Sequence, residues 1–219
     1  MILRNKSGGT PAVGRKGLMR FLGLKTGEAG IHKVTGDVEL IAAVPLALTD
    51  DGDDGRGYAW TLSTYDLDRH GEKIDPAGWD YESYMQNPVV EWAHRYDIPA
   101  IGKIEGLAID GRGLHGIVRF NEKDFDPFGW SIGQRVKAGV IRAGSVGFRV
   151  VEIEIPPKKD GDETALIFRR QELLEFSICN VPANPHALAK TAGGEKTDTL
   201  RDLGFPTFWG NIINGNIGV

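Results

Sequence analysis

The sequence predicts a mainly β fold with a few helices. Between residues 37 and 190, the commonest pattern is a short run rich in β-branched, aliphatic and aromatic residues, bounded by turn-forming residues. Signals for a helix start are few by comparison. The chain has 219 residues, of which 41% are hydrophobic and 26% charged, so one domain with a sizeable core is expected.

The strands are predicted in seven runs. They cover residues 37–48, 57–65, 88–94, 100–110, 114–120, 140–155 and 165–181. Asp110-Gly111 lies between two of them and predicts a hairpin, because this pair tolerates the positive φ of tight turns. The two last and longest runs are joined by a polar loop whose two prolines oppose ladder pairing.

Helices are predicted from their caps. Asp126 before Pro127 is an N-cap signal, and Phe128, Ile132 and Val136 then recur every four residues up to Gly139. The same start signal at Asn184-Pro185 predicts a second helix, and residues 78–86 suggest a third. The sum is a β-rich domain with three short helices.

The ends of the chain differ in composition from its middle. Up to Lys33 there are seven basic residues and one acidic residue, so residues 1–35 are predicted to form a flexible basic tail. Residues 36–190 are predicted to form the domain, and residues 191–219 a Gly/Asn-rich tail. The N-terminal segment lacks the pattern of a secretory signal.

Charge and cysteine content exclude several classes of protein. The net charge of −4 gives no overall attraction to nucleic acid or to an anionic membrane, and no apolar run is long enough for a membrane-spanning helix. Cys179 is the only cysteine, which rules out an internal disulfide and a multi-cysteine metal cage. We therefore predict no nucleic-acid partner and no membrane partner.

Two residues are candidates for a nucleophile and its base. Ser145 stands between Gly144 and Gly147, where missing Cβ atoms let a substrate approach, although a strand serine beside a bulge fits the local pattern better. His94 ends an apolar run, at the rim of the predicted sheet. A histidine that only bonds a nearby carbonyl fits this position equally well.

Glu175 is the candidate acidic residue. Strand alternation places Leu174, Phe176 and Ile178 on one face of its run, and Glu175 with Ser177 on the other. A carboxylate on a strand needs a partner. The partner can be the second nitrogen of a catalytic histidine, or an arginine across the sheet at position 149, 169 or 170.

Four ordered blocks carry a family resemblance. They read STYDLDRHGEKIDPAGW, then NPVVEWAH with IPAIGKIEGLAID, then AGSVGFRVVE, then LLEFSICNVPANPHAL. Together they resemble the prohead (capsid maturation) serine proteases of tailed bacteriophages, which are distantly similar to herpesvirus assemblins. The resemblance covers roughly residues 57–190.

The resemblance implies a catalytic triad and a task. It places the serine nucleophile at Ser145, the base at His94 and the third member at Glu175, where assemblins have a second histidine. It implies a closed β-barrel wrapped by helices, herpesvirus-protease-like. It further implies cleavage of scaffold or capsid-protein segments and of the chain itself, inside the procapsid in the bacterial host cytoplasm. By analogy with assemblins, it implies that copies of the chain associate. We predict no cofactor.

Three other readings compete with this one. The sequence AGSVG is close to the nucleophile elbow of α/β-hydrolase esterases, but a strand rather than a helix is predicted after the serine. The turn from Asp66 to Gly71 begins like a calcium loop, but Ala77 stands where the bidentate glutamate is needed, so we predict no metal. Finally, the chain can be a catalytically inactive assembly or scaffold module with the same fold.

Overall fold

The structure, a computed structural model, describes residues 2–3, 29–34, 38–45, 57–68, 71–157, 160–161 and 164–180. The N-terminal strands are β1 (Ile2–Leu3), β2 (Gly30–Lys33), β3 (Glu39–Pro45), β4 (Gly57–Thr64), β5 (Glu72–Ile74) and β6 (Trp79–Asp80). The later strands are β7 (Val89–Trp92), β8 (Gly102–Ile109), β9 (Gly113–Phe120), β10 (Ala143–Ile155) and β11 (Leu166–Cys179). The helices are the 3₁₀ helices η1 (Pro76–Gly78) and η2 (Tyr84–Gln86), and the α-helix α2 (Pro127–Lys137).

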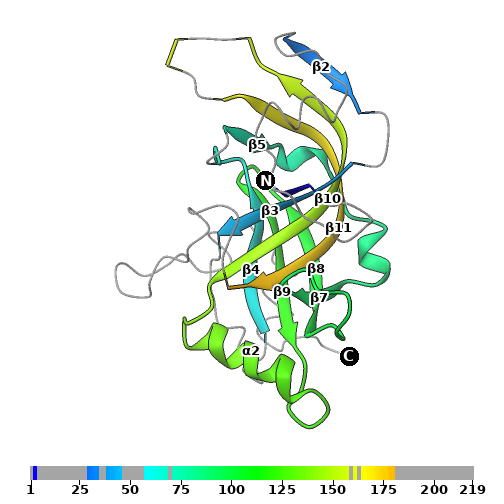
Figure 1. The fold of residues 1–219 in the computed structure, drawn as a ribbon, viewed down its shortest axis with the longest axis vertical. Helices are drawn as coiled ribbons and strands as arrows, with labels where there is room; N and C mark the ends of the chain where they lie inside the picture. The colour runs from blue at the N-terminus through cyan, green and yellow to red at the C-terminus, as the bar shows by residue number, and fades with distance from the viewer. Residues whose placement is uncertain are drawn as a thin grey trace, which may run out of the picture.

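The long antiparallel pair β10 and β11 organises the sheet. The hydrogen-bonded order is β1-β3-β10-β11-β7-β8-β9-β4, with β2 added to β10 and with β5 and β6 added to β11. Both long strands run along the length of the described molecule, from the end that carries β2 toward the end that carries α2 (Figure 1). The strands β5, β6 and β7 pair with β11 in parallel, one after another along it.

The prediction of a mainly β fold with few helices is confirmed. The sheet curls strongly, so that β3, which follows β1 at one end of the main strand path, approaches β4 at the other end. Within the described residues, however, β4 forms ladder pairs with β9 and not with β3. The sheet is therefore a curled half-barrel, and the closed barrel is not confirmed. Among the described residues, no helix is long and apolar enough to cross a membrane.

Two predictions about the elements differ from the structure, and a third is not tested by it. Residues 78–86 do not form the predicted α-helix. They contain the last residue of η1, then β6, which pairs with β11, and then η2. Gly30–Lys33 lies inside the predicted basic tail, yet it forms β2 and pairs with β10. The helix predicted after Asn184-Pro185 lies outside the described residues.

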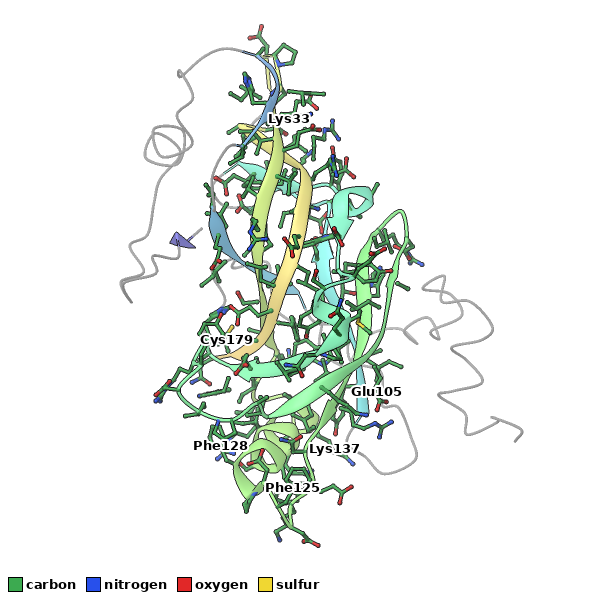
Figure 2. The ribbon with its side chains drawn as sticks, turned by 90° about the vertical axis from the view of Figure 1, so that its right-hand side faces the viewer. Lys33, Glu105, Phe125, Phe128, Lys137 and Cys179 are labelled. Carbon is green, nitrogen blue, oxygen red and sulfur yellow. The ribbon has the colours of Figure 1, made fainter. Side chains whose placement is uncertain are left out.

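Helix α2 forms as its cap signal predicts. The Asp126 carboxylate accepts a hydrogen bond from the Gly129 N–H at 3.0 Å, which satisfies one of the free donors of the first turn. Ile132 and Val136 are buried, whereas Phe128 stays 46% exposed and meets the edge of Trp92. Figure 2 shows Phe128 at the α2 end of the molecule, far from Lys33 of β2.

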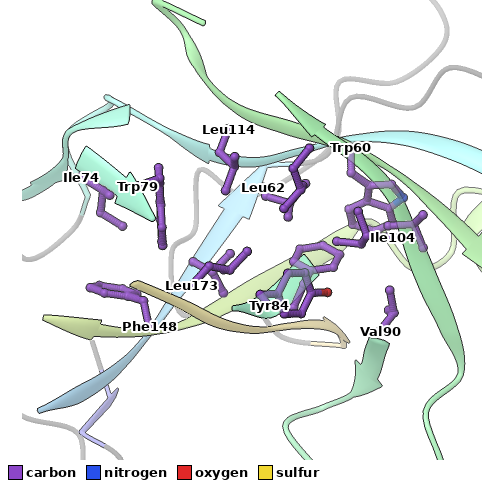
Figure 3. Close-up of a cluster of buried hydrophobic side chains, with 14 of the residues drawn as sticks. Trp60, Leu62, Ile74, Trp79, Tyr84, Val90, Ile104, Leu114, Phe148 and Leu173 are labelled. Atoms are coloured by element: carbon purple, nitrogen blue, oxygen red, sulfur yellow. The ribbon is translucent and has the colours of Figure 1, made fainter. Parts of the chain in front are cut away.

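The core fills the inside of the curled sheet. Its largest fully buried side chains are aromatic, and Figure 3 shows Trp60 of β4, Trp79 of β6 and Phe148 of β10 within one cluster. Several of these rings meet edge to face, as Trp79 does with Phe148 at 5.5 Å between centroids. The strand faces that do not point into this cluster are free to carry polar groups.

Glu72 of β5 is an acidic residue buried beside β11. It is 3% exposed, and its Oε2 atom has no hydrogen-bond partner among the described residues. Burial, with a further contribution from the negative charge of Asp68, raises the pKa of Glu72 from 4.5 to about 8. The folded protein therefore favours the protonated form of this carboxyl group near neutral pH.

We expect this carboxyl group to make stability depend on pH. Its pKa is higher in the folded chain, so its stabilising contribution is complete below pH 4.5 and is lost as pH rises through about 8. The free energy of unfolding should fall by up to about 1.4 kcal/mol per pH unit in this window. Urea midpoints at pH 5.5 and 8.5 should differ less in Glu72→Gln than in the wild type. An equal pH dependence in the two proteins, or the same loss of it in the exposed control Glu82→Gln, would contradict this assignment.

Candidate active site

Residues of β10 alternate between the core and the opposite face of the sheet. A Cβ atom on Gly144 would lie 2.5 Å from Phe176 and 3.0 Å from Trp60, so Gly144 faces the core and lets these two rings approach the backbone. Val146 is also buried in the core. Ser145 and Gly147 therefore share the other face, which also carries the polar residues of β11.

Ser145 lies in the middle of the sheet. Its Cα partners are Ala43 on β3 and Ser177 on β11, and it is 2% exposed. Its hydroxyl donates a hydrogen bond to the Ala42 carbonyl at 3.1 Å. Because a hydroxyl has one hydrogen, Ser145 must release the Ala42 carbonyl before it can donate to an imidazole.

His94 follows β7 in a strained turn. Ala93 and His94 have φ values of 52° and 59°, in the left-handed region that residues with a Cβ atom seldom adopt. Two hydrogen bonds to β11 hold this turn: the Ala93 N–H donates to the Ile178 carbonyl at 2.8 Å, and the His94 N–H donates to Ser177 Oγ at 3.1 Å. The strand ending alone does not orient the imidazole; these contacts with β11 do.

Glu175 and His94 are in direct contact. The Oε1 atom of Glu175 lies 2.6 Å from His94 Nδ1, and the carboxylate is almost fully buried. An ionised carboxylate can only accept, so Nδ1 carries the hydrogen and Nε2 is left as the basic nitrogen. This is the tautomer that a general base requires.

Gly147 lets the carboxylate lie over β10. A Cβ atom on Gly147, which pairs with Glu175, would lie 2.5 Å from Glu175 Cγ and 2.6 Å from its Oε1. The carboxylate thus occupies the space above Gly147, two residues along the same face from Ser145. The structure brings His94 and Glu175 together and puts Ser145 on their face of the sheet.

One face assignment from the sequence is wrong. The pairing of β10 with β11 shifts between Gly147 and Phe148, so that Leu174 is an extra residue in β11. Leu173, and not Leu174, is consequently buried in the core with Phe176 and Ile178 (Figure 3). Glu175 and Ser177 lie after this bulge, and their shared face is as predicted.

The arginines proposed as partners of Glu175 have other carboxylates within reach. Arg149 contacts Glu172 at 2.5 Å, and Arg169 contacts Glu154 and Asp75, each at 2.6 Å. Arg170 lies opposite Glu152 in the ladder. The histidine is the partner that the described geometry gives to Glu175.

Two other places in the structure contain residue types that catalyse reactions in other proteins. Thr61 Oγ1 lies 3.1 Å from His115 Nδ1, and His115 Nε2 lies 3.0 Å from Asp110. This partly buried group joins β4 and β9 to the hairpin after β8, and an internal threonine lacks the activating terminal amine. Burial raises the pKa of the Cys179 thiol to about 11, which keeps it protonated and poorly nucleophilic near neutral pH.

The esterase reading fails on the backbone around the serine. A nucleophile elbow places its serine on a sharp turn between a strand and a helix. Ser145 instead lies within β10, which continues as a strand to Ile155. The serine, the histidine and the acid lie on strands and at a strand end of one curled sheet.

Comparison with known proteins shows the family to which this chain belongs. A family model described as the caudovirus prohead serine protease matches residues 46–200. The chain belongs to this family. The resemblance predicted from the four sequence blocks is thereby confirmed.

Two similar proteins come from bacteriophages. The chain is 28% identical over 142 residues to a capsid polyprotein of Pseudomonas phage PAJU2, a match that covers 62% of this chain and 20% of the relative. The chain thus spans about a fifth of the length of that relative. The capsid assembly protease of bacteriophage T4 is 18% identical, with a TM-score of 0.45, over 66% of this chain and 98% of the other.

Sequence reasoning missed the part that Ser177 plays in this site. Its hydroxyl accepts from the His94 N–H and donates to Glu175 Oε2 at 3.3 Å. The alternation of β11 already placed Ser177 beside Glu175, which was the available signal. The positive φ values at Ala93 and His94 had no signal, because neither residue is a glycine or an asparagine.

Proposed function

We propose that this chain is a serine endopeptidase that cleaves scaffold or capsid-protein segments, and itself, during procapsid maturation. It would act inside the procapsid, in the cytoplasm of the bacterial host. The observation that carries this proposal is the 2.6 Å contact between Glu175 and His94, on the sheet face that bears Ser145. Family membership supports the same assignment of chemistry.

The proposed reaction uses the basic Nε2 of His94. After the Ser145 hydroxyl leaves the Ala42 carbonyl, its proton passes to Nε2 while Oγ bonds to the peptide carbonyl carbon. The peptide C–N bond then breaks, and the imidazolium gives its proton to the departing amine. A water molecule hydrolyses the resulting ester by the same proton route. Glu175 stabilises the imidazolium and holds His94 in the required tautomer.

The substrates are proposed from the relatives. The match to part of a capsid polyprotein supports a capsid-protein segment as substrate, since the matched region and the rest of that polyprotein belong to one chain. We propose residues 36–190 as the catalytic domain, to whose sheet Gly30–Lys33 adds β2, and residues 1–35 and 191–219 as segments open to self-processing. Association between copies of the chain is proposed by analogy with assemblins.

We also keep the closed, herpesvirus-protease-like barrel as a proposal. The approach of β3 to β4 supports it, and pairing at this place would cover the exposed edge of β4.

Covalent labelling tests the proposed function. We expect a fluorophosphonate probe to add once to the full chain, with the adduct on Ser145 by tandem mass spectrometry, because an activated serine attacks phosphorus as it attacks a carbonyl. Heat-denatured protein should not react. An adduct elsewhere, or none while a serine hydrolase in the same tube is labelled, would contradict the proposal and favour the inactive assembly module.

A further inference from the structure

Ser177 is a fully buried polar residue at the centre of the candidate site. It is 0% exposed, and it lies in β11 between Ser145 on β10 and Glu91 on β7. A buried hydroxyl is costly unless it forms hydrogen bonds. Both hydrogen bonds of the Ser177 hydroxyl go to the residues that would activate Ser145.

These bonds close a ring with His94 and Glu175. The His94 N–H donates to Ser177 Oγ, and the Ser177 hydroxyl donates to Glu175 Oε2. The other carboxylate oxygen, Oε1, accepts from His94 Nδ1. Each donor in the ring faces an acceptor, so the main chain of His94, its imidazole and the carboxylate are oriented together.

The ring also acts on the strained turn. A non-glycine residue in the left-handed region costs roughly 1–3 kcal/mol, and it persists only where surrounding contacts hold it. Ala93 is held by a backbone bond to Ile178, which a side-chain substitution leaves in place. His94 is held by Ser177 Oγ and by the turn bond that the Arg95 N–H donates to the Trp92 carbonyl at 3.0 Å, and only the first of these bonds depends on a side chain. Without that hydroxyl, its peptide group can turn and carry the imidazole with it.

We propose that Ser177 is a positioning residue that sets the orientation of both His94 and Glu175 toward Ser145. This inference rests on the proposed function. Ser177 touches no reacting atom; it acts by keeping Nε2 aimed at the nucleophile and by fixing the carboxylate plane. A displacement of about 1 Å in such a group is enough to slow a reaction about 100-fold.

Kinetics of three variants test the inference. With a peptide substrate cut by the full-length wild type, we expect Ser177→Ala to lower kcat by about 10–100-fold with little change in KM, because orientation and not substrate binding is lost. Ser177→Thr keeps the hydroxyl and should recover most of kcat. Ser63→Ala is the matched control, since Ser63 is also 0% exposed but its hydroxyl has no partner among the described residues; its kcat should equal that of the wild type.

Proton NMR separates this inference from the proposed function. The proton on His94 Nδ1 should give a strongly downfield resonance, identified by its absence from His94→Asn. In Ser177→Ala it should move upfield or broaden by faster exchange with water, even if no substrate is cut. Unchanged kcat together with an unchanged resonance would overturn the inference while leaving the protease intact. If the resonance is altered in Ser177→Ala while even the wild type cuts no substrate, the positioning by Ser177 would stand and the proposed function would be overturned.

Discussion

Replacing Ser145 by alanine should abolish cleavage and leave the fold unchanged. The substitution removes the only atom proposed to attack the substrate, and losing the serine nucleophile of subtilisin costs on the order of 10⁶ in kcat. Folding should survive, because the hydroxyl forms one bond to the Ala42 carbonyl and its loss costs about 1 kcal/mol. Intact-mass analysis after co-expression with a tailed-phage capsid protein that the wild type processes should show only uncut chains.

Another serine of the chain supplies the control for this experiment. Ser131 donates its hydroxyl to the Phe128 carbonyl on α2, away from the β10 and β11 strands, so Ser131→Ala should process like the wild type. Thermal unfolding of all three proteins shows whether loss of cleavage reflects loss of fold. Full processing by a folded Ser145→Ala protein would refute the nucleophile and support the inactive assembly module.

The elements that sequence predicted correctly are those with strong local signals. The hairpin of β8 and β9 forms where Asp110-Gly111 predicts it, but without the positive φ expected of this pair; the Asp110 carboxylate holds the turn by accepting from the Gly113 N–H at 3.0 Å. Helix α2 is fixed by Asp126 and its four-residue period. Both signals lie within a few residues of the structure that they determine, so they act whatever the rest of the chain does.

The errors arose where contacts between residues far apart in the sequence determine the local structure. Trp79 is drawn into the core against Phe148, and Asp80 pairs with β11, which breaks the helix expected at residues 78–86. The extra residue Leu174 reflects the pairing of β10 with β11, and no property of Leu174 itself marks it. Neither effect is visible in a window of ten residues.

The candidate site shows the same division. Alternation placed Glu175 on the polar face of β11 correctly, but it left the choice between His94 and an arginine open. That choice depends on the turn at Ala93 and His94, which bends the chain back over β11. The space above Gly147 then admits the carboxylate. Both features depend on which strands are neighbours, and periodicity does not reveal this.

Replacing Glu175 by glutamine should lower kcat by about 10³–10⁴ with little change in stability. The amide has nearly the volume of the carboxylate, so it fits above Gly147 and still offers an oxygen to the Ser177 hydroxyl. Its NH₂ group, however, can donate to His94 Nδ1, which moves the imidazole hydrogen to Nε2 and removes the base. The same exchange of acid for amide in a serine protease triad costs about 10⁴ in kcat.

The neighbouring acid on β11 provides the comparison that isolates this effect. Glu172 forms its contact with Arg149 and is two ladder positions from Glu175, so Glu172→Gln removes one negative charge from the same strand without touching His94. If charge alone mattered, the two variants would lose similar activity. We expect Glu172→Gln to stay within about threefold of the wild type, since a partly exposed ion pair contributes little. Equal kcat values for Glu175→Gln and the wild type would instead show that His94 finds its tautomer without the carboxylate, and would remove Glu175 from the triad.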